Sequence, residues 1–165
     1  AATKLAGEHL CGNFSNLYGM RVVCLRFFTV YGPGQRPDLA IHKSTDMIVK
    51  GKPIPKFGEG NTRRDYTYID DIIQGVMGAI RYRGELFDIF NLGESETTTL
   101  NELIAALENA LGKKAQIEQL PEQKGDMPLT SADITKARAL LGYNPQTKIA
   151  DGIPKFVDWY LSLRK

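Results

Sequence analysis

Cysteine and histidine are scarce in this chain, which has two of each among its 165 residues. Cys11 and Cys24 both lie in apolar surroundings on expected regular elements, so we expect reduced core thiols rather than a disulfide. Two lone thiols are also too few for a metal site, and we expect no metal. His9 and His42 both fall in segments with a helical pattern, which gives histidine-based catalysis little support.

An excess of charge of one sign is absent as well, because the formal net charge is only +2. So small a charge provides no broad basic field, and we expect no nucleic-acid partner. The longest apolar runs are too short to cross a bilayer, and residues 1–8 have the pattern of an amphipathic helix rather than of a signal peptide. Together with the reduced cysteines, these absences predict a cytoplasmic protein without a membrane partner.

Two further absences concern the beginning of the chain and its glycines. The sequence does not begin with methionine and starts inside a helical pattern with no capping residue before it, so we expect a fragment of a longer protein. No Gly-x-Gly-x-x-Gly follows an expected strand, and Gly58 and Gly60 have the wrong spacing for a dinucleotide loop. We therefore expect that the 165 residues of this sequence do not contain a complete dinucleotide-binding site.

The chain does have a concentrated arginine-rich turn. Arg63 and Arg64 follow a glycine-rich turn at 58–61 and lead into a short alternating segment. A guanidinium matches phosphate oxygens with a planar fork of donors and stays charged at any working pH, so this turn is a candidate clamp for a phosphorylated ligand. The alternative is a solvated arginine pair bonded to Asp65 or Asp70, and the residues alone leave both interpretations open.

Hydrophobic periodicity and glycine stops predict an α/β fold. Helices are expected over 1–19, 39–51, 69–81, 99–111, from 131 or 133 to 141, and over 149–163. Strands are expected over 20–28, 52–57, 66–68, 86–92 and 115–120, while the loops at 29–38, 58–65 and 121–128 carry the unusual residues. The segment 20–28 is nearly continuous in apolar residues, which is typical of a parallel strand covered on both faces.

Side-chain patterns give more specific expectations for helix ends and faces. Asp38 is expected to cap the helix over 39–51, and Thr99 to form a capping box with Glu102. Apolar residues recur with a helical period in two of these segments. In 1–19 they are Leu5, Leu10, Phe14 and Leu17. In 69–81 they form the expected inner face of the helix: Ile72, Ile73, Val76, Met77 and Ile80.

Several short strings occur in a characteristic order: AATK at 1–4, RFFTVYGP at 26–33, QRPD at 35–38, RDYTYIDD at 64–71, NLG at 91–93, and GD at 125–126 followed by AD at 132–133 and KA at 136–137. In this order and spacing the chain resembles the C-terminal half of extended short-chain dehydrogenases/reductases that act on nucleotide sugars. The most similar group is the UDP-glucose and UDP-glucuronate 4-epimerases, and the resemblance covers essentially the whole chain.

The resemblance implies an α/β chain with two parts. Residues 1–38 would be the remnant of an NAD-binding Rossmann domain, and residues 39–165 mainly a nucleotide-sugar-binding lobe. The implied reaction is interconversion of C4 stereoisomers by transient oxidation with bound NAD. The implied substrate is a UDP-hexose or UDP-uronic acid. The implied assembly is a homodimer or a self-associating fragment.

The resemblance also assigns catalytic and cofactor-binding residues. Lys4 matches the lysine of the family's Tyr-x-x-x-Lys signature, whose tyrosine would stand one residue before Ala1. Positions four apart share a helix face, so the lysine can lower the pKa of that phenol and hold the nicotinamide ribose. Phe28 and Val30 are the further residues implied to contact NAD. Without the tyrosine, we expect the isolated chain to be inactive.

The implied substrate-binding residues are Thr29, Arg36, Ile54, Phe57, Arg64, Gln123 and Asp126. Arg64 matches an arginine that grips the diphosphate, and Asp126 an acid that binds the uridine ribose, while segment 54–57 borders the uracil. Gln123 stands where many members have a second phosphate-binding arginine. Arg36 is a candidate for the carboxylate of a uronic acid, and its alternative is a loop arginine paired with Asp38.

Two other functions remain open from the sequence. One is a standalone module that binds a nucleotide sugar without chemistry, and the other is a sibling enzyme such as a 4,6-dehydratase or decarboxylase. The identity of the sugar is open as well, because selectivity depends on the volume of the pocket.

Overall fold

The computed structural model describes residues 1–123 and 125–163. Its elements in chain order are α1 (Ala2–Tyr18), β1 (Val22–Phe27), β2 (Thr29–Tyr31), α2 (Ala40–Lys50), β3 (Ile54–Phe57), β4 (Arg63–Arg64), β5 (Tyr66–Tyr68), α3 (Ile69–Arg81), β6 (Phe87–Leu92), β7 (Thr98–Thr99), α4 (Leu100–Leu111), β8 (Ile117–Leu120), α5 (Thr135–Leu141) and α6 (Ile149–Ser162). No helix in these described ranges is long and apolar enough to cross a membrane.

The strands of the described chain join in pairs, and three of the four pairs are parallel. In the longest pair, β1 lies beside β6, with Val22 opposite Phe87 and Phe27 opposite Leu92. Shorter parallel pairs join β2 to β5 and β3 to β8, whereas β4 and β7 are antiparallel. This parallel pairing between helices confirms the predicted α/β class.

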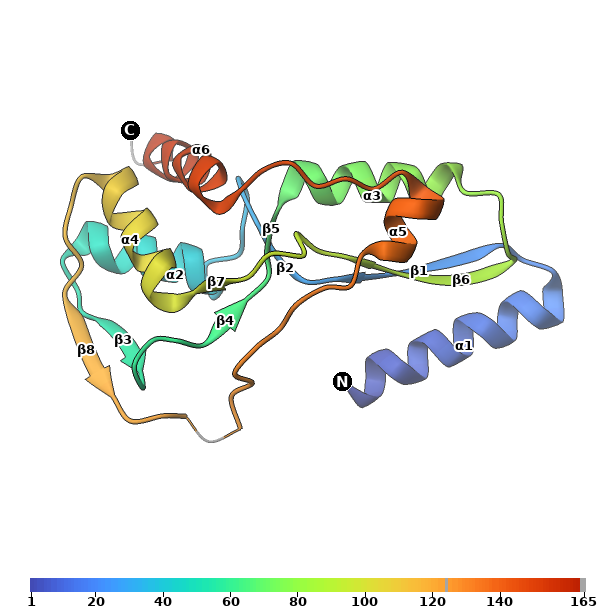
Figure 1. Cartoon of the computed structure of the whole chain (residues 1–165), viewed down its shortest axis with the longest axis horizontal. Coiled ribbons are helices and arrows are strands. Elements are labelled where there is room, and N and C mark those ends of the chain that lie inside the picture. Colours follow the sequence, from blue (N-terminus) through green and yellow to red (C-terminus); the bar gives the residue numbers. More distant parts are fainter. Residues whose placement is uncertain (124, 164–165) are drawn as a thin grey trace.

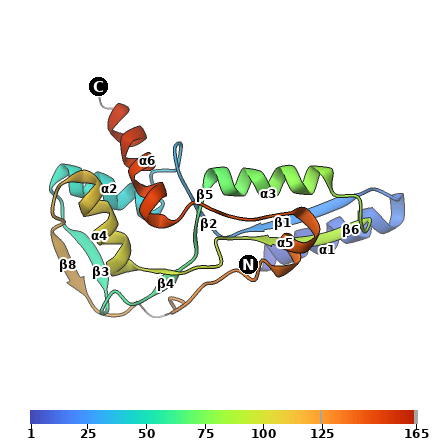
Figure 2. The same cartoon turned by 45° about the horizontal axis from the view of Figure 1, so that its top comes forward.

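The molecule has two apolar cores at its two ends. One core lies among α2, α4 and α6, and its fully buried members include Ile41, Leu103 and Phe156. The other lies where α3 and α5 cover the β1–β6 pair, and includes Phe90 and Leu92. Figures 1 and 2 show α3 and α1 on opposite sides of this pair. The short strands β2, β4 and β5 connect the two ends.

The prediction of which side chains form the inner face of α3 is partly wrong. Ile72 is buried and Val76 packs against the core, but Ile73, Met77 and Ile80 are exposed. The helix instead approaches its neighbours through glycines, since a Cβ at Gly75 would lie 2.6 Å from Leu92 and one at Gly78 would lie 2.6 Å from the Leu141 carbonyl oxygen. On the buried face of α3, close approach of the backbone at glycines therefore takes the place of the apolar side-chain contacts that the periodicity predicted.

The first helix has its expected length but not a buried apolar stripe. Gly19 ends α1 in the left-handed conformation, as predicted, with φ of 62°. The apolar stripe itself is exposed: Leu5, Leu10, Phe14 and Leu17. The adjacent β1 is only partly covered, with Phe27 exposed, so the expectation of a strand buried on both faces is wrong.

The cysteines and the segment after β1 also differ from expectation. Cys11 and Cys24 are free thiols, as predicted, but both are only partly buried rather than core residues. Burial, and after it the neighbouring Cys11, raise the pKa of the Cys24 thiol to about 11. The expected turn over 29–38 begins with the three-residue strand β2, which its pairing with β5 makes possible.

Of the three predictions for helix starts, one is confirmed and two are shifted along the chain. The capping box is confirmed, because Thr99 Oγ1 accepts from the Glu102 amide at 3.0 Å and Glu102 Oε2 accepts from the Thr99 amide at 2.7 Å. Asp38 is not the cap of α2, whose N-cap is Leu39. The helix expected from 131 or 133 begins at Thr135, whose amide donates to the Asp133 carboxylate.

Candidate ligand-binding site

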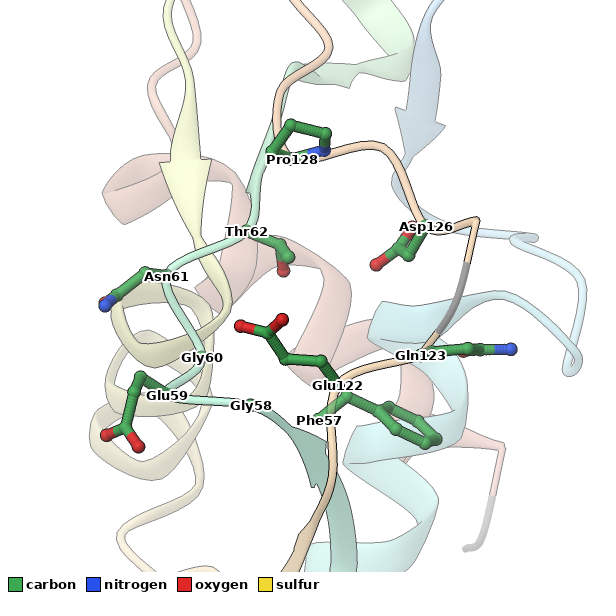
Figure 3. A pocket seen from close by; sticks show the side chains of 10 residues that line it. All are labelled: Phe57, Gly58, Glu59, Gly60, Asn61, Thr62, Glu122, Gln123, Asp126 and Pro128. Carbon is green, nitrogen blue, oxygen red and sulfur yellow. The ribbon is translucent and has the colours of Figure 1, made fainter.

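A cavity of about 290 Å³ lies between the end of β3 and the loop after β8. Figure 3 shows its lining: Phe57, Gly58, Glu59, Gly60, Asn61, Thr62, Glu122, Gln123, Asp126 and Pro128. The carboxylates of Glu122 and Asp126 point into the cavity, whereas Glu59 and Asn61 point away from it. The predicted glycine-rich turn and the predicted polar loop thus form one site.

The glycine-rich wall is shaped by backbone conformation and by α4. Gly58 and Gly60 have φ of 56° and 73°, in the left-handed region that favours glycine. A Cβ at Gly60 would lie 2.5 Å from Asn101 Oδ1, because the first turn of α4 packs directly on this turn. Asn101 also donates to the Glu59 carbonyl at 2.8 Å, which fixes the wall in place.

Arg64 joins this wall to the opposite loop. Its Nη1 donates to the Met127 carbonyl at 2.6 Å, and its Nη2 forms an ion pair with Asp126. Its neighbour Arg63 points elsewhere and donates twice to Thr97 at 2.7 Å. In the described part of the chain neither guanidinium bonds to Asp65 or Asp70, so the pairing considered as the alternative is not the one observed.

The residues predicted to border a nucleotide are only partly gathered at this cavity. Phe57, Gln123 and Asp126 line it, and Arg64 reaches it through Asp126. The Ile54 side chain is buried in the core, so only its strand leads to the cavity. Gln123 is exposed and extends outward in Figure 3.

Sequence reasoning missed Glu122, whose carboxylate faces the middle of the cavity. Its Cγ packs within 2.8 Å of where a Gly58 Cβ would be, so the glycine makes room for this side chain. The only signal was its place in a loop already marked as unusual. A glutamate in an exposed polar loop has no pattern that sets it apart.

A second group of predicted residues surrounds the loop after β2. Val30 and Arg36 line a separate cavity of about 230 Å³. Arg36 is exposed and donates to Asp38 at 2.9 Å, which is the alternative pairing considered from sequence. Thr29 is partly buried and its amide donates to the Asp65 carbonyl at 3.1 Å.

Lys4 lies on a third part of the surface. It lines a cavity of about 490 Å³ together with Glu8, Arg26 and Phe27. Arg26 donates twice to Glu8, at 2.7 and 2.6 Å, and these bonds lower the pKa of that carboxyl.

The three residues predicted to contact a cofactor do not share one cavity. Phe28 and Val30 pack against the second core instead of lining the cavity at Lys4. Metal ligation has no candidate among residues 1–123 and 125–163, where no group of three or more His, Cys, Asp or Glu side chains is placed to hold an ion.

The family of the chain follows from a comparison with family models. The model described as NAD dependent epimerase/dehydratase family matches residues 1–93, which is more than half of the sequence. The chain belongs to this family.

Individual members of the NAD dependent epimerase/dehydratase family are similar over nearly the whole chain. The UDP-glucuronate 4-epimerase of Thermodesulfobacterium geofontis is 41% identical over 160 residues, which are 96% of this chain and 49% of that protein. The crystal structure of the Bacillus cereus UDP-glucuronic acid 4-epimerase with UDP-glucuronic acid and NAD has a TM-score of 0.91 at 39% identity, covering 98% of this chain and 52% of that one. The Thermotoga maritima UDP-glucose 4-epimerase with UDP-glucose has a TM-score of 0.90 at 28% identity, covering 98% and 53%.

This chain spans about half the length of the family members it matches. The arrangement found in those structures nonetheless extends over nearly all of the present residues. The resemblance to nucleotide-sugar epimerases inferred from the short strings is therefore confirmed at the level of the family and the fold.

Proposed function

We propose that this chain is the nucleotide-sugar-binding part of a 4-epimerase for UDP-glucose or UDP-glucuronate. The observation that carries the proposal is the Arg64–Asp126 pair, which joins β4 to the loop that lines the cavity of about 290 Å³. The Bacillus cereus relative, which binds UDP-glucuronic acid and NAD, supports the same assignment. We further propose that the protein is cytoplasmic.

The paired residues have the chemistry that a nucleoside diphosphate requires. The guanidinium of Arg64 is suited to bidentate contact with phosphate oxygens. The Asp126 carboxylate accepts hydrogen bonds, so it is suited to two ribose hydroxyls. A bound diphosphate would compete with Asp126 for Arg64 and leave the carboxylate free for the ribose. The exposed ring of Phe57 offers a face for the uracil.

The sugar would extend toward the loop after β2, where Arg36 and Thr29 are candidate contacts. Arg36 pairs with the exposed Asp38. The carboxylate of a uronate sugar has the same charge as Asp38 and could take its place as the partner of Arg36. This exchange favours a UDP-uronic acid over a neutral UDP-hexose.

NAD would serve as the transient acceptor of hydride from C4 of the sugar. Of the residues proposed for it, Lys4 fits best, because its ammonium is exposed and lines the 490 Å³ cavity, where it can donate to a ribose hydroxyl. Phe28 and Val30 are partly buried and pack against the second core, and Val30 lines the cavity of about 230 Å³ instead, so they support the cofactor site less than Lys4 does. Residues 1–38 are proposed to belong to the NAD-binding part and 39–165 mainly to the substrate-binding part. We expect no epimerisation from the 165-residue chain alone.

Titration of the chain with UDP tests the proposal, with Arg64→Ala and Arg63→Ala as a matched pair. The two arginines are adjacent and equally charged, but only the Arg64 side chain bonds to a residue that lines the cavity, Asp126, whereas the Arg63 side chain bonds to Thr97. Loss of charge-assisted hydrogen bonds predicts about 10- to 100-fold weaker binding for Arg64→Ala and an unchanged affinity for Arg63→Ala by calorimetry. Equal effects of the two variants, or no binding of UDP to the unaltered chain, would contradict the assignment.

A further inference from the structure

Asp65 is a fully buried carboxylate next to the arginine of the proposed site, and its exposed fraction is 0%. Its Oδ1 accepts from the Glu94 amide at 2.8 Å and from Thr67 Oγ1 at 3.0 Å. Its Oδ2 accepts from the amides of Ser95 and Ala132, both at 3.0 Å. Four donors thus surround a group that would be costly to bury without them.

These donors come from parts of the chain that are far apart in sequence. The successive amides of Glu94 and Ser95 both donate to the carboxylate, in a turn where Ser95 has φ of 65°, a conformation that a side chain disfavours. A Cβ at Gly93 would lie 2.8 Å from Asp65 Oδ2 and 2.3 Å from the Ala132 Cβ. The turn after β6 and the segment that contains Ala132 are therefore packed onto Asp65 with no room for a further atom.

The segment held at Ala132 is continuous with the loop that carries Asp126. The Arg63 amide donates to the Pro128 carbonyl at 2.8 Å, and the Thr130 amide donates to the Arg63 carbonyl at 3.1 Å. Segment 126–132 is thus attached at successive points to residues 63–65: to the Arg64 side chain at its start and to Asp65 at its end.

We propose that Asp65 is a positioning residue that sets the distance between Arg64 and the loop bearing Asp126, and thereby the affinity for a nucleoside diphosphate. This inference rests on the proposed function of the Arg64–Asp126 pair. Asp65 touches no ligand in this scheme. It acts through the segment whose end it holds: together with the two backbone bonds to Arg63, the bond to Ala132 keeps the loop that bears Asp126 beside Arg64.

Asp71 provides a matched control for a purely structural role. It is a second buried aspartate, and its two oxygens accept from the amides of Gln146 at 3.0 Å and Thr147 at 2.9 Å. The segment that it holds leads into α6 and does not line the cavity. Asp65→Asn and Asp71→Asn therefore make the same chemical change in two buried anchors, only one of which is linked to the site.

The experiment is a UDP titration of the 165-residue chain and of both variants, with Kd referred to folded protein. Asparagine keeps the shape of aspartate but replaces one accepting oxygen with a donor, which opposes the amides that face it. We expect Asp65→Asn to raise Kd at least tenfold and Asp71→Asn to leave Kd within twofold. If Asp65→Asn does not fold, Thr67→Val removes one donor to the carboxylate, and we expect it to raise Kd two- to threefold.

A double-variant test separates positioning from general destabilisation. If Asp65 acts through Arg64, then Asp65→Asn made in the Arg64→Ala background adds less than a twofold further loss of affinity. Unchanged Kd in Asp65→Asn, equal losses in both aspartate variants, or fully additive losses with Arg64→Ala would each overturn the proposal.

A failure of the positioning role of Asp65 can be distinguished from a failure of the proposed function. Amide chemical shifts of Met127, Leu129 and Thr130 report the position of the loop without any ligand, and we expect them to change in Asp65→Asn but not in Asp71→Asn. Absence of UDP binding by the unaltered chain would contradict the proposed function. Unchanged loop shifts in Asp65→Asn would overturn the positioning role itself.

Discussion

Neighbouring residues of the same type can have unrelated tasks, as Arg63 and Arg64 illustrate. Successive side chains of a strand point to opposite faces, so β4 turns one guanidinium to Thr97 and the other to Asp126. The sequence identified the pair as unusual. It did not distinguish its members, because the choice depends on which segments pair with β4.

The close packing around Gly93 predicts how a single substitution changes stability. We expect Gly93→Ala to lower the free energy of unfolding by about 1–3 kcal/mol, since the added methyl would overlap Ala132 and Asp65. Urea denaturation measures this change. Gly7→Ala is the matched control: position 7 has open space on helix α1, so alanine there should raise stability by about 0.5–1 kcal/mol. A loss of stability in Gly7→Ala, or none in Gly93→Ala, would contradict this reading of the packing.

Single residues of the site were predictable where their chemistry is distinctive. Phe57, Gln123 and Asp126 were expected at the ligand and do line one cavity. Glu122 was missed, because its role comes from the space left by Gly58 and not from any sequence pattern. The four bonds to Asp65 were likewise hidden, since three of their donors are backbone amides that any residue supplies.

At the scale of elements, the C-terminal ends of helices were predicted better than their starts or their faces. Glycines that adopt the left-handed conformation end α1, α2, α4 and α5 where expected. The face of α3 was misjudged because periodicity counts apolar side chains, whereas this helix packs through Gly75 and Gly78. The two-residue strands β4 and β7 were missed because they exist only through their mutual pairing.

The start of α6 is tied to the end of β6 by a buried charge. Lys148, the N-cap of α6, pairs with Glu94 at 2.8 Å and with the exposed Glu96 at 2.7 Å. Glu94 is 5% exposed, and its Oε2 has no hydrogen-bond partner in the described chain. Burial raises the pKa of the Glu94 carboxyl above its ordinary value of 4.5, although Lys148 opposes this shift.

This arrangement predicts how stability depends on pH. Between 4.5 and the raised pKa of Glu94, the folded chain binds more protons at this carboxyl than the unfolded chain does. The contribution of Glu94 to the free energy of unfolding therefore falls as the pH rises through that window. We expect Glu94→Gln to remove this slope in urea titrations over pH about 4 to 8, and Glu96→Gln to keep it. An unchanged slope in Glu94→Gln would contradict the expectation.

At the scale of the whole molecule, apolar surface is concentrated on α1 and α3. Leu10, Phe14 and Leu17 are 58%, 51% and 75% exposed on α1, and Ile73, Met77 and Ile80 are exposed on α3. These helices flank the β1–β6 pair on opposite sides (Figure 1). Exposed apolar stripes of this kind favour association.

We propose that the chain self-associates through these helices, in line with the assembly expected from the sequence. Sedimentation velocity should show a species larger than a monomer at micromolar concentrations. Replacing Leu10, Phe14 and Leu17 with glutamine should shift the chain toward monomer. Leu161→Gln, which changes an exposed leucine on α6, should leave the distribution unchanged. A monomeric unaltered chain would contradict the proposal.

The parallel strand pairs also have a consequence for the time course of folding. Each joins residues more than 35 positions apart, as in Thr29 with Tyr66 and Val22 with Phe87. Closing a loop of this length costs conformational entropy before the stabilising contacts between the strands can form, and this cost slows folding. During synthesis the contacts between β1 and β6 can therefore form only after β6 has left the ribosome, when α2, β3 and α3 have already been made.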